Sequence, residues 1–385
     1  MNFELTEIAY ANTPLRSLKT KRFYLRLLRS DVLIFAGTHF ISIFQKLHLP
    51  IGWFFRSTIF RQFCGGETLE ECARVVEKNA SSGVKSLLDY SVEAGSGSAE
   101  PSGNLNEIIR SIHFASNNPY IDFAVFKPTG IADMSQLSIL RQKSDSARAV
   151  FEQNCSLIAR EAAKRGVSVL VDAEDYEFQD EVDAMAGKIM AELNREKVVF
   201  YNTVQMYRTD RLEYVSDLIE KAKAGGFFAG IKLVRGAYLE KERLLAKKHG
   251  YESPVFNTKQ ETDDAYNAAL HLILENISYV GLFAGTHNEH SNQLLATAMT
   301  EKGLAKNDKR VYFAQLYGMA DHISNTLASQ GYNVVKYVPY GKVSEVIPYM
   351  MRRIEENSSV SQQSKREIEM ITSEIKRRKE FKYDN

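Results

Sequence analysis

Short apolar segments recur at regular intervals from residue 86 onward, and longer segments of helical periodicity separate them. Each apolar segment is five to eight residues long and ends in a polar or glycine-containing break, which is typical of a buried strand. The predicted strands are Ser86–Val92, Ile121–Lys127, Ser168–Asp172, Val198–Gln205, Phe228–Val234, Tyr279–Thr286, Val311–Gln315 and Asn333–Pro339. The clearest predicted helices are Ala147–Arg165, Val182–Lys197, Leu212–Ala224 and Asp263–Asn276.

Alternation of strands and helices over this part of the chain predicts an α/β protein with a closed (β/α)8 barrel of the TIM type. A doubly wound sheet is the alternative, but it usually carries a phosphate-binding glycine motif after its first strand. The glycines in Ala94–Ser98 lack the third member of that motif and indicate a linker. We therefore expect a barrel over residues 66–360, an N-terminal helical region over 1–65, and a charged C-terminal tail over 361–385 that is a solvated helix or frayed.

Composition adds few constraints. The 385 residues are 44% apolar and 25% charged, which is ordinary for a soluble globular protein. A net charge of +1 argues against a nucleic-acid binder. Cys64, Cys72 and Cys155 match no zinc or redox spacing, and three cysteines favour a reducing compartment.

The N-terminal region is basic and aromatic. Between Arg16 and Arg61 there are nine basic residues and one acidic residue, Asp31. The longest uncharged run, Val32–Gln45, is too short to span a bilayer, which needs about 20 apolar residues. Such a segment can lie on an anionic membrane surface, or it can cap the barrel, and the two interpretations do not exclude each other.

Polar residues gather where the predicted strands end, and in a barrel the active site lies at those ends. Together they predict one wide, polar cavity with several positive charges, suited to a large anionic cofactor and a small carboxylate substrate. No metal site is expected, because His287 and His290 have no evident third ligand. The strand-end residues are Asp89, Glu93, Lys127, Asp172, Gln205, Lys232, Arg235, Tyr238, Thr286, His287, Asn288 and Gln315.

The helix expected after the eighth strand carries Tyr349, Arg352, Arg353 and Glu356 at positions i, i+3, i+4 and i+7, so that they share one face. Two guanidinium groups beside an aromatic ring can clamp a small carboxylate under a flat wall. The alternative is a solvated polar face on an ordinary amphipathic helix.

Taken in order, these segments resemble proline dehydrogenase, the flavin-dependent barrel family, over about residues 60 to 358. Each motif is weak alone, and the ordered combination is specific. The motifs are Leu88–Glu93, Phe126-Lys127, Val171–Glu174, Val204–Tyr207, Lys232–Tyr238, Thr286–Asn288, Gln315–Met319 and Tyr349–Glu356.

The resemblance implies an FAD that is held without a covalent bond. Lys232 would lie near the reactive nitrogen of the flavin, where the family usually has arginine, and Asn257 stands where a threonine often contacts the ribose. Tyr317 replaces a common histidine of the family. The implied cofactor residues are Gln205, Lys232, Val234, Arg235, Gly236, Ala237, Asn257, Thr286, His287, Asn288, Gln315 and Glu356.

The resemblance also implies a site for L-proline. Its carboxylate would be held by Lys127, Arg352 and Arg353, and its ring would lie among Tyr238, Leu316 and Tyr349. Asp89 would pair with Lys127, and Glu93 with Arg352, as a gate that closes on the substrate. Lys232, Asp172 and Tyr238 are the implied catalytic residues, with Asp172 anchoring the Lys232–Tyr238 block.

The implied reaction is hydride transfer from proline to the flavin, which gives Δ1-pyrroline-5-carboxylate. Electrons would pass to a membrane quinone, and the product would pass to a separate pyrroline-5-carboxylate dehydrogenase. We expect peripheral association with the inner face of a bacterial cell membrane, because no transit peptide is evident, with the mitochondrial inner membrane as the alternative. A hydroxyproline dehydrogenase, a flavin-free barrel lyase and a membrane-surface scaffold remain open.

Overall fold

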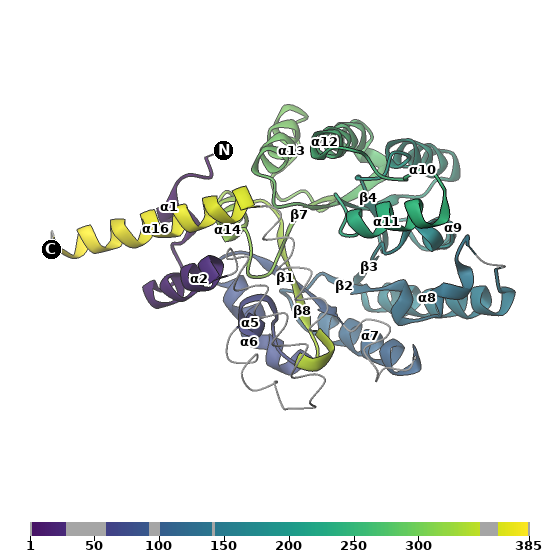
Figure 1. Cartoon of the computed structure of the whole chain (residues 1–385), viewed down its shortest axis with the longest axis horizontal. Helices are drawn as coiled ribbons and strands as arrows, with labels where there is room; N and C mark the ends of the chain where they lie inside the picture. Colours follow the sequence, from purple (N-terminus) through teal and green to yellow (C-terminus); the bar gives the residue numbers. More distant parts are fainter. Residues whose placement is uncertain (1, 28–58, 92–100, 141–142, 347–360, 384–385) are drawn as a thin grey trace.

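A computed structural model describes residues 2–27, 59–91, 101–140, 143–346 and 361–383 of the chain. Eight parallel strands form a closed barrel in sequence order, and β8 pairs with β1 to close it (Figure 1). This confirms the predicted (β/α)8 fold. The strands are β1 (Lys85–Tyr90), β2 (Phe123–Phe126), β3 (Ser168–Val171), β4 (Phe200–Gln205), β5 (Ala229–Val234), β6 (Val280–Gly285), β7 (Val311–Leu316) and β8 (Val334–Tyr340).

Large side chains fill the barrel interior below the strand ends. Phe123 lies among three rings, with centroid distances of 5.1 Å to Phe283, 4.7 Å to Tyr312 and 5.7 Å to Tyr201. The interior is therefore a packed core, and open space lies at the carboxyl ends of the strands. The buried interior cluster is Leu87, Phe123, Val125, Leu170, Tyr201, Phe283, Ala314, Val335 and Tyr337.

The outer helices place their apolar faces on the barrel. Their ends follow local chemistry: Thr258 and Glu261 form a capping box at the start of α12, and Gly166 takes a left-handed conformation after α8. The helices outside the strands are α6 (Leu69–Ala80), α7 (Pro101–Ser116), α8 (Asp145–Arg165), α9 (Tyr176–Leu193), α10 (Arg211–Gly225), α12 (Lys259–Glu275), α13 (Glu289–Glu301) and α14 (Asp321–Ser329).

Helix α9 begins and ends earlier than the predicted Val182–Lys197. Asn194 explains the end, because its side chain accepts hydrogen bonds from the backbone N–H groups of Val199 and Phe200, both at 2.9 Å. Its amide also donates to the carbonyls of Phe200 and Phe228 at 2.9 Å. One buried asparagine thus ends α9 and fixes the start of β4, which periodicity alone does not reveal.

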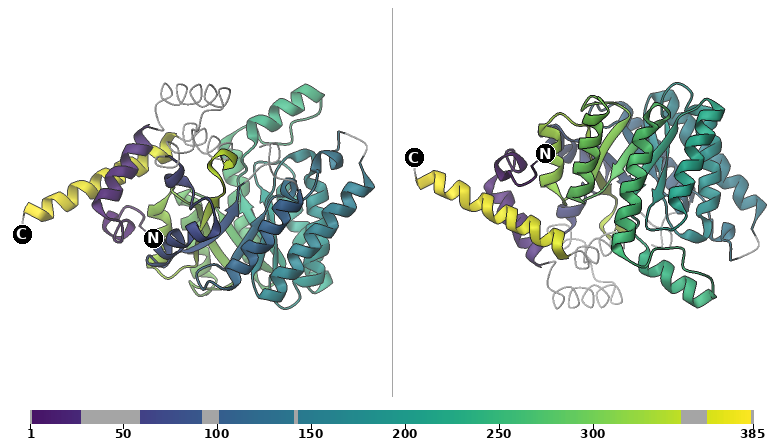
Figure 2. Two further views of the ribbon diagram at one scale, coloured as in Figure 1. Left: turned by 90° about the horizontal axis from the view of Figure 1, so that it is seen from below. Right: turned by 90° about the horizontal axis from the view of Figure 1, so that it is seen from above.

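Helix α11 (Leu239–His249) is an addition to the simple alternation, inserted between β5 and α12. In Figure 2 it projects from the edge of the barrel. Its first residue follows Tyr238 directly, so the helix continues the strand-end segment after β5.

The two chain termini pack together beside the barrel, where the purple and yellow helices lie side by side in Figures 1 and 2. The C-terminal segment is helical, but its prediction as a solvated or frayed tail was wrong. Ile368, Ile371 and Ile375 form a narrow stripe that is buried against Leu18 and Leu25. The stripe was not recognised in the sequence because charged residues surround it. These elements are α1 (Thr6–Ala9), α2 (Leu15–Leu27), α5 (Ile59–Phe63) and α16 (Ser361–Tyr383).

The question of membrane contact rests largely on residues 28–58, which lie outside the described residues. No helix that the structure describes is long and apolar enough to cross a membrane.

Candidate functional site

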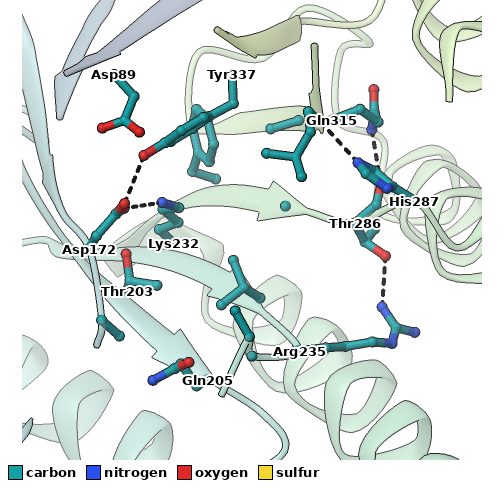
Figure 3. A pocket seen from close by; sticks show the side chains of 18 of the residues that line it. Asp89, Asp172, Thr203, Gln205, Lys232, Arg235, Thr286, His287, Gln315 and Tyr337 are labelled. Carbon is teal, nitrogen blue, oxygen red and sulfur yellow. Dashed lines mark hydrogen bonds and ion pairs between the residues drawn. The ribbon is translucent and has the colours of Figure 1, made fainter. Parts of the chain in front are cut away.

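A cavity of about 350 Å³ lies at the carboxyl ends of the strands (Figure 3). Fifteen of the predicted site residues line it, and they come from all strands except β8 or from the segments that follow them. They are Asp89, Lys127, Asp172, Gln205, Lys232, Val234, Arg235, Gly236, Ala237, Tyr238, Thr286, His287, Asn288, Gln315 and Leu316.

Asp172 is the centre of a buried charge cluster in this cavity. One carboxylate oxygen accepts a hydrogen bond from Lys232, and the other accepts one from the Tyr337 hydroxyl at 2.7 Å (Figure 3). Lys127 lies 3.5 Å from the same carboxylate and donates to both oxygens of Asp89, at 2.7 and 2.8 Å. The contact expected between Asp89 and Lys127 is therefore present.

Two lysines and two aspartates make this cluster neutral as a whole, which is what allows four charges to be buried together. Burial acts to lower the pKa of Lys127, but the carboxylates of Asp89 and Asp172 outweigh it and raise that pKa above its usual value. Burial acts to raise the pKa of Asp172, and the ammonium groups of Lys232 and Lys127 reverse the effect. Asp172 thus stays ionised.

Sequence reasoning missed Tyr337, whose hydroxyl orients Asp172 and whose ring lies 4.9 Å from the Lys232 ammonium. The signal was available in the alternation along β8, because Val335 and Tyr337 point into the barrel together. Thr203 and Phe283 also line the cavity without having been predicted, and so does Met319, which was named only within the motif Gln315–Met319.

Arg235 is held by three neighbours on one side of the cavity. It donates to the Thr286 hydroxyl oxygen at 2.7 Å (Figure 3). It also donates to Ser291 at 3.0 Å and to Asp263 at 2.5 Å. Its guanidinium also lies 4.4 Å from the centroid of the Tyr266 ring. These contacts use three of five N–H donors, so the fixed group keeps capacity for an anionic ligand.

His287 is fixed by the neighbouring strand end. Its Nε2 accepts a hydrogen bond from the backbone N–H of Leu316 at 3.0 Å, so the neutral ring carries its proton on Nδ1. Thr286 accepts from Arg235 and from the Asn288 backbone N–H at 3.1 Å, which leaves its own O–H to donate. The segment after β6 therefore presents the Thr286 hydroxyl to the cavity as a donor.

Gly236 opens the cavity wall beside Tyr207. Its φ is +126°, and a Cβ built there would lie 2.5 Å from the Tyr207 ring. Only a residue without a side chain fits at this point. The backbone of Gly236 and Ala237 is consequently exposed to any ligand in the cavity.

A second buried carboxyl joins α11 to the segment after β3. Glu242 accepts a hydrogen bond from the Tyr176 backbone N–H at 2.8 Å, and its Oε2 has no hydrogen-bond partner in the described part of the chain. Burial raises the pKa of Glu242 to about 7, and the nearby charge of Asp175 adds to the effect. Lys241 donates to Asp175 at 2.6 Å beside this contact.

Some predicted residues are placed elsewhere or not described. Asn257 is exposed and does not line the cavity, whereas Lys259, two residues further on, does. The described residues hold no group of three or more His, Cys, Asp or Glu side chains that could bind a metal ion. The predicted residues outside the described ranges are Glu93, Tyr349, Arg352, Arg353 and Glu356.

Residues 72–366 match the family model described as proline dehydrogenase. A carbapenem antibiotics biosynthesis protein of Pectobacterium carotovorum subsp. carotovorum is 35% identical over 82% of this chain and 83% of its own length. A mitochondrial proline dehydrogenase of Dictyostelium discoideum is 31% identical over 88% of this chain and 68% of its own. A hydroxyproline dehydrogenase of Xenopus laevis is 30% identical over 85% of this chain and 79% of its own length.

Among solved structures, proline utilization A from Bdellovibrio bacteriovorus superposes with a TM-score of 0.72 at 24% identity. The match covers 78% of this chain and 33% of that chain, so this chain spans about a third of that protein. The likeness concerns the fold, and it agrees with the closed barrel.

Proposed function

This chain belongs to the proline dehydrogenase family, and we propose that it oxidises L-proline to Δ1-pyrroline-5-carboxylate with FAD as its cofactor. The observation that carries the proposal is the cluster of Lys127, Asp172, Lys232 and Tyr337 in a largely apolar cavity that Arg235, Lys259 and Thr286 also line. A cation-rich cavity of this kind suits a substrate carboxylate and an anionic cofactor.

The residues present fit a flavin dinucleotide. Arg235 has N–H donors beyond its three described contacts for phosphate oxygens, and the Thr286 hydroxyl adds a neutral donor beside it. Gly236 and Ala237 are exposed and line the cavity, and the absence of a Cβ at Gly236 lets this segment pack against the Tyr207 ring. We propose that these residues, with Gln205, Lys232, Val234, Ala237, Asn288 and Gln315, hold the cofactor.

The chain's own groups would bind and orient the substrate. Lys127 pairs with Asp89 and lies near Asp172, and an incoming substrate carboxylate can pair with the same ammonium group. We propose that Asp89 acts as a gate by exchanging its place at Lys127 with the substrate carboxylate. Arg352, Arg353 and Tyr349 complete the substrate site in this proposal, with Leu316 and Tyr238 along the ring.

A bound flavin supplies the acceptor for the hydride that leaves the ring carbon next to the proline nitrogen. Lys232 contributes a fixed positive charge in the cavity, held in place by Asp172 and by the Tyr337 ring. Asp172 would lose its pairs with two cations on accepting a proton, so water is the better acceptor for the amine proton.

We further propose that electrons pass to a membrane quinone and the product to a separate pyrroline-5-carboxylate dehydrogenase. The basic, aromatic N-terminal segment supports a peripheral position on a membrane that contains quinone. The bacterial cell membrane and the mitochondrial inner membrane are both compatible with it; several relatives are named as mitochondrial proteins.

Hydroxyproline oxidation is the second candidate, because the Xenopus laevis relative carries that name. The two substrates differ by one hydroxyl on ring carbon 4, which the resemblance places against Tyr349. An aromatic wall at that point favours the substrate without the hydroxyl, since a buried hydroxyl needs a hydrogen-bond partner.

Initial rates with L-proline and trans-4-hydroxy-L-proline test the proposal, with flavin-loaded protein, a soluble quinone analogue and detection of the pyrroline product. We expect proline to be the better substrate, and Tyr349→Ser to shift the preference toward hydroxyproline. Faster oxidation of hydroxyproline by the wild-type protein would establish the second candidate. Oxidation of neither compound by protein that holds FAD would overturn both.

A further inference from the structure

The loop over residues 316–321, between β7 and α14, forms one wall of the cavity. Leu316 and Met319 line the cavity directly. Two residues of the loop have a positive φ, Gly318 at +81° and Ala320 at +51°. In the described part of the chain, Ala320 is the only non-glycine residue with a positive φ. A backbone in this region is strained for alanine and needs outside contacts to hold it.

Those contacts come from the two ends of the chain. On α2, Lys21 is 8% exposed and donates to Asp321 at 2.6 Å and to Glu367 on α16 at 2.5 Å. The other oxygen of Glu367 accepts a hydrogen bond from the backbone N–H of Ala320 at 3.2 Å. One lysine from the N-terminal helix thus ties the C-terminal helix to the strained point of the loop.

The network continues toward the cavity through β8. Lys336, which is 3% exposed, lies 2.9 Å from Asp321 and donates to the carbonyls of Leu316 and Met319. Lys21, Asp321, Lys336 and Glu367 therefore form a neutral set of two cations and two anions, in which Asp321 is half-buried and the other three are buried. Removing one member leaves a buried charge without its full complement of partners.

Helix α16 also reaches the adjoining part of the cavity. Arg366, next to Glu367, pairs with Glu289, which follows the cavity residue Asn288 directly. His322, on α14, contacts the same carboxylate at 3.0 Å. Two neighbouring residues of α16 therefore hold the two segments that carry His287 and Leu316, which are themselves joined by a hydrogen bond.

This arrangement lies at the edge of the part that the chain shares with its family, because the match to the family model covers residues 72–366. Lys21 and Glu367 fall outside it. Asp321, Lys336 and Arg366 fall inside it, so the network joins matched and unmatched parts of the chain.

We propose that Lys21 is a positioning residue for substrate binding, acting through Asp321 and Glu367 to fix the 316–321 loop against the cavity. The inference rests on the proposed function, because it assigns Leu316 to the wall that holds the substrate ring. Lys127, Asp172 and Lys232 lie outside the network, so its loss affects binding of the ring more than the chemical step.

Lys21→Met tests the proposal, since it removes the charge and keeps most of the side-chain volume. We expect the KM for L-proline to rise about tenfold, while kcat stays within about twofold and the bound flavin per chain is unchanged. Lys21→Arg keeps the charge and should restore most of the loss. Lys19→Met, on an exposed position of the same helix, is the matched control and should match the wild type.

An unchanged KM in folded Lys21→Met protein, or a fall in kcat and flavin content with KM unaltered, would overturn the proposal. Should Lys21→Met fail to fold, Glu367→Gln removes only one charge and keeps an acceptor for Ala320; it must still raise KM selectively. Wild-type protein that holds FAD and does not oxidise proline would instead count against the proposed function.

Discussion

At the scale of single residues, Asp172 determines the charge balance of the cavity, because Lys232, Lys127 and Tyr337 all converge on it. Removing one partner of a buried ion pair costs about 3–5 kcal/mol, and loss of a fixed electrostatic contact lowers kcat about a hundredfold. We therefore expect Asp172→Asn to lower the melting temperature in thermal unfolding and to lower kcat in a steady-state assay.

The matched control is Asp175→Asn. Asp175 pairs with a single cation, Lys241, and although the Asp175 side chain is only 17% exposed, that of Lys241 is 52% exposed, so the pair is solvated at one end and contributes less than a buried one. A kcat for Asp172→Asn close to that of the control would show that the cluster is not part of the catalytic machinery.

Gly236 is a second test at this scale. Gly236→Ala combines a positive φ with a 2.5 Å approach to the Tyr207 ring, so we expect loss of flavin binding and a lower melting temperature. Gly250→Ala separates the two causes, because Gly250 has φ +73° and no atom within 4 Å of an added Cβ. Equal flavin content in both variants, measured by absorbance, would rule out the steric argument.

Sequence reasoning found the cavity residues well because strand ends of a barrel converge whatever the connecting loops do. It placed Asp89, Asp172 and Lys232 together without showing that Asp172 pairs with both Lys127 and Lys232. Tyr337 was missed because it lies in the middle of β8, whereas the prediction rested on residues at the strand ends. Asn257 was expected at the cofactor and is exposed, just before Thr258, which caps α12.

At the scale of elements, α11 is held to the barrel by a buried carboxyl. Glu242 has a pKa of about 7 in the folded protein, well above its usual value, so the folded state binds this proton more tightly than the unfolded state. The associated stability is fully present below about pH 4.5 and is lost as pH rises through about 7. Asp175, Lys241 and Arg208 are the charged groups that act on it.

Glu242→Gln keeps an acceptor for the Tyr176 N–H and cannot ionise. We expect its melting temperature to exceed that of the wild type by a few degrees, about 2–4 °C, at pH 8.5 and to approach it at pH 5.5. The exposed Glu240→Gln on the same helix should show no such trend. A difference that does not vary with pH would contradict the ionisation of Glu242 in the fold.

Elements with a strong period were predicted to within a few residues, as β5 and α8 show. The early end of α9 was not, because Asn194 ends the helix through contacts with residues up to Phe228. The burial of α16 was missed because the stripe of Ile368, Ile371 and Ile375 is narrow, and its partner α2 lies more than three hundred residues away in sequence.

At the scale of the whole molecule, the barrel forms from a regular alternation of strands and helices, and the two ends of the chain meet beside it. The alternation was visible in the sequence because each unit folds from local pattern. The meeting of the ends was not, since it depends on contacts between residues far apart in sequence, namely a narrow apolar stripe on α16 and the ion pairs of Lys21. Family membership and the charge cluster together support one chemical task for the molecule.

The most direct test of that task is the visible spectrum of the purified, flavin-loaded protein on addition of L-proline without oxygen. We expect the oxidised-flavin absorbance to bleach with proline and much less with trans-4-hydroxy-L-proline, and one pyrroline product to form per flavin reduced. A bound flavin that stays oxidised in saturating proline would contradict the proposed activity while leaving the barrel and its cavity in place.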